Sequence, residues 1–174
     1  MRKEWIPMLI QKRTITLRQM EDTMTDYELM REWFSEPELQ EWVWCDEKDE
    51  APVTIERIIE KYGSRIKNPT TVFPYFILRD QEPIGFIQYY IQDQVTIGLD
   101  MWIGIQKERN HGFGTDALKQ MVEIIHNKYP DVKHVFVDPE IANKRAIKCY
   151  QKAGFKSSGE IVDGNLILRI NFED

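Results

Sequence analysis

The chain has 174 residues, of which 42% are hydrophobic and 30% are charged, so we expect one globular domain over residues 1–174 with a sizeable core. No apolar run approaches the roughly 20 residues of a membrane helix, which argues against a membrane protein. The formal net charge of −6 argues against nucleic acid as the main partner and suits a cationic ligand.

The N-terminal part predicts a lead-in, a strand and a helix. Residues 1–12 lack a signal-peptide core, so we expect a peripheral segment and a cytoplasmic location. Residues 14–18 alternate in polarity, which is typical of a strand. Residues 25–28 form a capping-box pattern, which predicts the start of a helix that ends before Pro37.

Residues 38–52 are expected to be irregular and are rich in acidic and aromatic side chains. These are Glu41, Trp42, Trp44, Asp46, Glu47, Asp49 and Glu50. Two interpretations stay open. The segment is either a solvated acidic loop with its tryptophans against the core, or a wall over a site for a cationic, sugar-like ligand. A second helix is predicted over residues 53–67 from its apolar face.

The middle of the chain predicts three strands, then a glycine-bearing loop and a helix. Residues 72–79 and 83–91 are expected to form a hairpin, and residues 97–105 the next strand. After the loop at residues 109–115, apolar side chains recur with helical spacing, from Ala117 to Ile125.

The loop has the character of an anion site. A helix start offers N–H groups without partners and the positive end of a dipole, and Gly112 and Gly114 allow a bulky anion to approach the backbone. No Gly-Lys-Ser/Thr follows, so the loop is not a Walker loop. A third glycine is missing, so it is not a dinucleotide fingerprint either.

The C-terminal part predicts a short strand over residues 133–138, a helix over 143–153 and a hairpin of 155–162 with 166–172. Neither a disulfide framework nor a metal site is expected, because Cys45 and Cys149 are the only cysteines and have no metal-ligand spacing.

Two motifs together resemble the GNAT acetyltransferases. The first is Arg109-x-x-Gly112-x-Gly114, and the second runs from Asn143 through Ala146 and Tyr150 to Gly154-Phe155. The resemblance implies an α/β fold with a twisted mixed sheet flanked by helices. In it, the strands at residues 97–105 and 133–138 splay apart and acetyl-CoA binds between them.

The same resemblance implies which residues hold the coenzyme. They are Trp102, Ile103, Gly104, Ile105, Arg109, Asn110, His111, Gly112, Phe113, Gly114, Thr115, Asn143, Ala146 and Tyr150. The loop amides, with Arg109 beside them, would hold the pyrophosphate. Tyr150 would act as general acid at the sulfur, although its place on the apolar face of a helix also suits a core aromatic.

Asp100 stands in an otherwise apolar strand, so this carboxylate has a partner, lines a cavity or faces water. Gly98-Leu-Asp-Met-Trp-Ile resembles a motif of the aminoglycoside 6′-N-acetyltransferases, in which the Asp is assigned as base or amine anchor. Residues 83–90, 41–44 and 138–147 also resemble that group. Met101 and Trp102 depart from its pattern, and two glycines are missing after Trp44.

This closer resemblance implies an acceptor site. Its residues are Glu41, Trp42, Trp44, Gln88, Tyr90, Asp100 and Asp138. Asp100 and Tyr150 would be catalytic, and Asp138 either holds a second amine or caps a turn before Pro139.

The sequence therefore predicts direct acetyl transfer from acetyl-CoA to a primary amine of a polycationic small molecule, above all the 6′-amine of an aminoglycoside. The alternatives are another amine, such as a polyamine, a siderophore precursor or a peptide amine, and a non-catalytic acetyl-CoA-binding protein. The enzyme is expected to be a monomer or homodimer.

Overall fold

The computed structural model describes residues 15–44 and 52–172. The described strands are β1 (Ile15–Gln19), β2 (Val72–Arg79), β3 (Glu82–Ile91), β4 (Thr96–Ile103), β5 (His134–Val137), β6 (Lys156–Val162) and β7 (Asn165–Asn171). The described helices are α1 (Met24–Trp33), α2 (Pro37–Trp42), α3 (Ile55–Lys67), α4 (Phe113–Lys128) and α5 (Lys144–Lys152), with a 3₁₀ turn, η1, at Gln106–Glu108.

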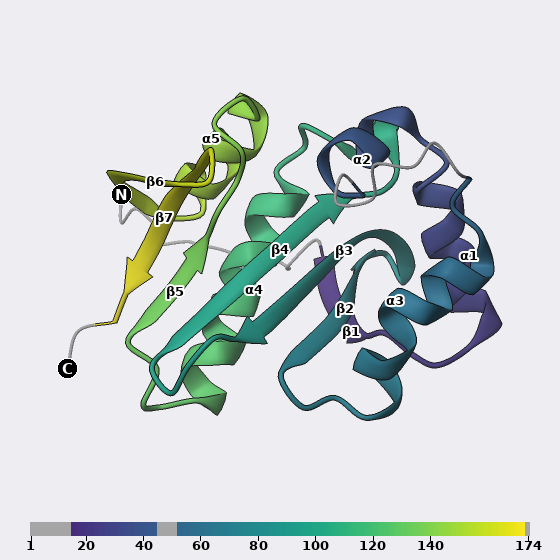
Figure 1. The fold of residues 1–174 in the computed structure, drawn as a ribbon, viewed down its shortest axis with the longest axis horizontal. Coiled ribbons are helices and arrows are strands. Elements are labelled where there is room, and N and C mark those ends of the chain that lie inside the picture. The colour runs from purple at the N-terminus through teal and green to yellow at the C-terminus, as the bar shows by residue number, and fades with distance from the viewer. Residues whose placement is uncertain (1–14, 45–51, 173–174) are drawn as a thin grey trace, which may run out of the picture.

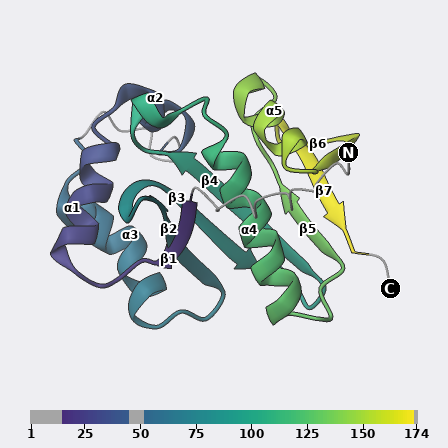
Figure 2. The same ribbon diagram turned by 180° about the vertical axis from the view of Figure 1, so that it is seen from behind.

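The strands form one mixed sheet in the order β1-β2-β3-β4-β5-β7-β6. Neighbouring strands are antiparallel except for β4 and β5, which are parallel. The helices α1, α2 and α3 gather on one side (Figure 1), and α4 runs across the opposite face (Figure 2). The predicted fold, a mixed sheet flanked by helices, is confirmed.

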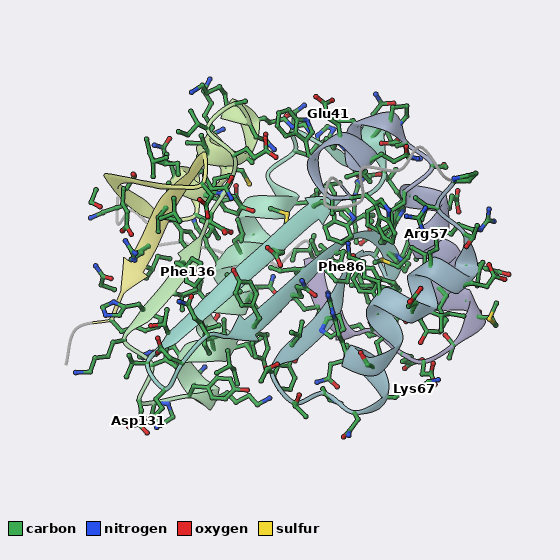
Figure 3. All side chains as sticks on the ribbon, in the orientation of Figure 1. Glu41, Arg57, Lys67, Phe86, Asp131 and Phe136 are labelled. Atoms are coloured by element: carbon green, nitrogen blue, oxygen red, sulfur yellow. The ribbon has the colours of Figure 1, made fainter. Side chains whose placement is uncertain are left out.

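The sheet separates two hydrophobic cores because side chains alternate along each strand. On β3, Ile87 and Tyr89 pack in the core under α4, whereas Phe86 packs in the core under α1, α2 and α3. Phe86 stacks on Trp102 of β4, with ring centroids 4.1 Å apart, and Figure 3 shows Phe86 between the sheet and these helices. Both faces of β3 are therefore buried.

Two predictions about the N-terminal helices are wrong. The cap of α1 is Thr23, whose hydroxyl accepts from the amide of Asp26, and not Thr25. Residues 38–52 are not wholly irregular, since they include most of α2, which begins at Pro37. Proline suits this first helical position, because an N–H in the first turn has no partner within the helix and proline has none. Residues 1–14 and 45–51, with Cys45, Asp46, Glu47, Asp49 and Glu50, lie outside the described residues.

The only parallel pair among the described strands, β4 and β5, forms a fork. Strand β4 pairs with β5 over Thr96–Gly98 alone and then continues to Ile103 without it. At Gly98, the ring of Tyr90 occupies the space of a side chain, because an added Cβ would lie 2.2 Å from a ring carbon. The predicted splayed pair is thus present and opens beyond Gly98. None of the helices in the described ranges has the length and apolar character needed to cross a bilayer.

Candidate active site

A cleft of about 1050 Å³ lies at the open end of the β4–β5 fork. Its walls are the end of β4, the residues after β5, the start of α4, one face of α5, and side chains of α2 and α3. The cleft therefore brings together segments from most of the described chain. Within those described ranges, no cluster of three or more His, Cys, Asp or Glu side chains could hold a metal ion.

One end of the cleft is formed by the first turn of α4. Gly112 is its N-cap, with a φ of 83° that favours glycine, and no side chain caps the turn. By contrast, Thr23, Thr54 and Asn143 cap α1, α3 and α5 with their own oxygens. The first amides of α4 are therefore open to an anion, with the helix dipole behind them.

Basic side chains of α5 extend this positive end of the cleft. Arg145, Lys148 and Lys152 all line it, because their spacing places them on one helix face. Sequence reasoning missed them, since charged residues on a helix ordinarily face solvent. Together with the open amides of α4, they suit a ligand that carries several phosphates.

Arg109 differs from its predicted role. Its guanidinium donates to Glu38 at 2.6 Å, to Glu36 at 2.5 Å and to the carbonyl of Ile103 at 3.0 Å. Glu38 also pairs with Arg145 at 2.5 Å. The side chain of Arg109 thus braces α2 against the end of β4, and the open amides are better placed for an anion than its occupied guanidinium.

Most of the other residues predicted for the coenzyme line the cleft. These are Trp102, Ile103, Asn110, Gly112, Phe113, Gly114, Thr115, Asn143, Ala146 and Tyr150. Gly104, Ile105 and His111 do not line this cleft, so their contact with the coenzyme stays a prediction. At Gly104 the space for a side chain is taken by the ring of Trp33, since an added Cβ would lie 2.3 Å from it.

Asp100 is half-buried in the cleft wall, and its position follows from strand pairing. Gln88 on β3 lies opposite Asp100 on β4, and its amide nitrogen donates to Oδ2 of Asp100 at 2.7 Å. Arg65 of α3 in turn donates to Oε1 of Gln88 at 3.2 Å. Sequence reasoning placed Gln88 against the ligand and missed Arg65, because nothing in the sequence of α3 indicates which strand it contacts.

Asp138 lies across the cleft, directly after β5. Burial, together with the nearby Asp100 carboxylate, raises the pKa of Asp138 to about 6. Two carboxylates close enough to disfavour each other's ionisation form a good site for a cation, which relieves the repulsion.

Tyr150 of α5 lines the same cleft and also belongs to the core under α4. Burial, followed by the charge of Asp100, raises the pKa of its phenol. The hydroxyl therefore keeps its proton at neutral pH and remains a hydrogen-bond donor. Its ring packs in the core, as one interpretation of the sequence expects, and the residue also borders the cleft, so its role as general acid stays a prediction.

Three residues predicted for the acceptor do not line this cleft. Trp44 is buried against Phe34, with ring centroids 4.8 Å apart, so the core interpretation holds for it. Glu41 is exposed on α2, as Figure 3 shows, whereas Trp42 does line the cleft. Tyr90 borders a second hollow of about 740 Å³, which shares Asp138 with the first.

The chain is similar to known proteins over most of its length. Residues 22–162 match the acetyltransferase (GNAT) domain family. The aminoglycoside N(6')-acetyltransferase type 1 of Klebsiella pneumoniae is 31% identical over 171 residues, which cover 90% of this chain and 82% of that protein. A kanamycin resistance protein of Rhizobium radiobacter is 36% identical over 75 residues, covering 42% of this chain and 68% of that protein.

Solved structures are similar as well. Aminoglycoside acetyltransferase AAC(6')-Ib in complex with coenzyme A and kanamycin has a TM-score of 0.76 at 28% identity, covering 90% of this chain and 94% of that one. Its complex with ribostamycin and coenzyme A gives 0.77 at 29% identity, covering 90% and 92%. A spermidine N-acetyltransferase from Vibrio cholerae, at 15% identity, a TM-score of 0.70 and coverage of 90% and 93%, shares the fold.

Proposed function

Because this chain belongs to the GNAT acetyltransferase family, we propose that it transfers the acetyl group of acetyl-CoA to the 6′-amine of an aminoglycoside. It is an N-acetyltransferase of that family. The observation that carries the choice of acceptor is the pair of carboxylates, Asp100 and Asp138, in the wall of the cleft opened by the strand fork. Relatives named for aminoglycosides support it.

The residues present fit coenzyme A at the positive end of the cleft. The uncapped first turn of α4, from Phe113 to Thr115, would hold the pyrophosphate through backbone amides. The backbone of β4 beyond Gly98, which β5 leaves unpaired, would hydrogen-bond to the pantetheine amides. When bound, acetyl-CoA supplies an activated acetyl thioester.

At the acceptor end, the carboxylates have separate tasks. An amine attacks only when neutral, so a base must take a proton from its ammonium form. Asp100 is the proposed base, since it lines the cleft and its Oδ2 is held by Gln88. Asp138 would hold a second ammonium group of the acceptor, which a polycation offers and a simple amine does not.

Tyr150 is the proposed donor to the departing sulfur. Its phenol stays protonated because burial raises its pKa, so it is able to donate a hydrogen bond to a thiolate as charge develops there. Cys149 beside it is not assigned a covalent role, since burial raises the pKa of its thiol and disfavours the nucleophilic thiolate.

The test is a thiol-release assay with acetyl-CoA against kanamycin, spermidine and a peptide with a free amino terminus. We expect turnover with kanamycin to exceed that with the other two acceptors by at least about tenfold in kcat/KM. Asp100→Asn should lower kcat by roughly two orders of magnitude while coenzyme binding, measured by calorimetry, stays unchanged. If kcat/KM is instead highest with spermidine or with the peptide, the acceptor is an amine of that class and not an aminoglycoside.

A further inference from the structure

Gln88 is held between a cation and an anion. Its Oε1 accepts from Nη1 of Arg65 at 3.2 Å, and its Nε2 donates to Oδ2 of Asp100 at 2.7 Å. A guanidinium only donates hydrogen bonds and a carboxylate only accepts them, so just one orientation of the amide satisfies both neighbours. Arg65 therefore determines which end of Gln88 faces Asp100.

The three side chains come from α3, β3 and β4, and each is fixed by its own surroundings. Gln88 and Asp100 are directly opposed in the β3–β4 ladder, and Gln88 is only 8% exposed. Arg65 lies over the ring of Tyr62, with its guanidinium carbon 5.0 Å from the ring centroid. No carboxylate in residues 15–44 and 52–172 forms an ion pair with Arg65, and its guanidinium donates to Gln88.

From this chain of contacts we propose that Arg65 and Gln88 are positioning residues, which hold the Asp100 carboxylate in the rotamer that accepts the acceptor's proton. The proposal rests on the proposed function of Asp100 as base. The hydrogen bond from Gln88 to Oδ2 fixes the orientation of the Asp100 carboxylate. A rigid carboxylate loses less entropy when it binds the amine, which is why the supporting residues affect rate.

The titratable groups around Asp100 affect the pH at which its carboxylate takes up a proton. They are Tyr62 from α3, Tyr90 from β3, Asp138 after β5 and Tyr150 from α5, whereas Arg65 of α3 reaches Asp100 through its hydrogen bond to Gln88. The tyrosines keep their protons at working pH, since burial raises the pKa of each. Loss of the Gln88 donor removes a hydrogen bond to the charged carboxylate, so the acidic limb of kcat/KM should move to higher pH.

The experiment compares Gln88→Met, Arg65→Met and the double variant in the full chain, with kcat/KM measured against pH. We expect Gln88→Met to lower kcat about thirtyfold and move the acidic limb upward by about one pH unit. Arg65→Met should lower kcat about fivefold, with the KM for acetyl-CoA unchanged. The double variant should match Gln88→Met alone, because Arg65 acts only through Gln88.

Two further variants separate this role from a general effect of charge or folding. Arg65→Lys keeps a cationic N–H donor for Oε1 of Gln88 and should therefore retain more of the wild-type kcat than Arg65→Met does. Lys67→Met removes a cation from the end of α3, away from the cleft (Figure 3), and should leave kcat and the pH profile unchanged. If Gln88→Met fails to fold, the Arg65 variants still give the test, since Arg65 is half-buried.

The outcomes distinguish the two proposals. The positioning role would be overturned if the double variant lowered kcat by the product of the two single effects. It would also be overturned if the acidic limb of kcat/KM stayed at the same pH in Gln88→Met. Wild-type turnover in Asp100→Asn would instead remove Asp100 as base. If Asp100→Asn is inactive while all Arg65 and Gln88 variants are fully active, the proposed function stands and the positioning proposal fails.

Discussion

Nη1 of Arg109 lies 2.6 Å from Oε2 of Glu38, and this contact joins the start of α2 to the loop that precedes α4. The same guanidinium donates to the carbonyl of Ile103 at the end of β4. The side chain of Arg109 is only 7% exposed, so the charge depends on these partners for its solvation.

Arg109→Met should therefore destabilise the fold. We expect a loss of about 2 kcal/mol or more, because Glu36 is left partly buried without its cation and Glu38 keeps only Arg145. For a chain of this length, thermal denaturation should show Tm lowered by roughly 4–8 °C. Arg169→Met is the matched control, since the Arg169–Glu160 pair is equally short at 2.6 Å but its two side chains are 36% and 45% exposed. An equal loss of Tm in the two variants would contradict the stabilising contact of Arg109 between α2 and the end of β4.

Asp138→Asn should change stability in a pH-dependent way. The pKa of Asp138 is raised to about 6 from 3.8, so the folded chain binds this proton more tightly than the unfolded chain. The free energy of unfolding accordingly falls as pH rises between these values, and it stays lowered above them. The variant should be more stable than the wild type at pH 8, by about 1 kcal/mol after solvent screening, and no more stable near pH 4.

Thermal melts at both pH values check this expectation, without ligand. The control is Asp163→Asn in the exposed turn between β6 and β7, where positive φ suits asparagine as well as aspartate. A Tm difference for Asp138→Asn that is the same at pH 4 and pH 8 would mean that ionisation of this carboxyl does not oppose folding.

Gly112→Val should weaken coenzyme binding. Gly112 has φ of 83° and no atom within 4 Å of an added Cβ, so a side chain there strains the backbone and occupies open space at the cleft. Gly159→Val is the matched control, with φ of 88° and equally open surroundings, but on β6 and outside that cleft. Calorimetry should show at least about tenfold weaker coenzyme A binding for the first variant alone. Equal affinities would argue against a phosphate site at α4.

Tyr150→Phe should lower kcat by about tenfold or more and leave the KM for acetyl-CoA nearly unchanged, because only a donor used late in the reaction is removed. Tyr89→Phe is the control. Its hydroxyl contacts Tyr129 and Lys128 at the C-terminal end of α4, outside the cleft, so its loss should affect Tm and not kcat. A rise in KM with unchanged kcat for Tyr150→Phe would assign this residue to packing alone.

Local patterns in the sequence predicted most elements of the fold. The hairpin of β2 and β3, the helix after the glycine loop and the C-terminal hairpin follow from periodicity and turn residues, which act over a few positions. The N-cap was misplaced because Thr23 and Thr25 are both followed after three residues by an acidic side chain. Helix α2 was missed because it is a single short helix with little apolar periodicity.

The site was predictable where a motif carries it and not where distant segments meet. Asp100, Asp138 and Tyr150 stand in motifs and do share one cleft. The contacts of Arg65 with Gln88 and of Arg109 with Glu38 join residues far apart in sequence, and no local pattern specifies them. Trp44 was ambiguous for the same reason, since its burial depends on Phe34 and on the cation of Lys61 above its ring.

The position of β3 inside the sheet determines which parts of the chain unfold locally and which unfold only with the whole domain. Its backbone amides bond to β2 on one side and β4 on the other, and its side chains are buried on both faces. Amide hydrogen exchange should consequently be slowest along this strand and fastest along β6, which is exposed along its whole length at the edge of the sheet. We therefore expect the amide of Gln88 to exchange only on global unfolding. Thermal opening of peripheral segments should then leave the hydrogen bond from Gln88 to the Asp100 carboxylate intact.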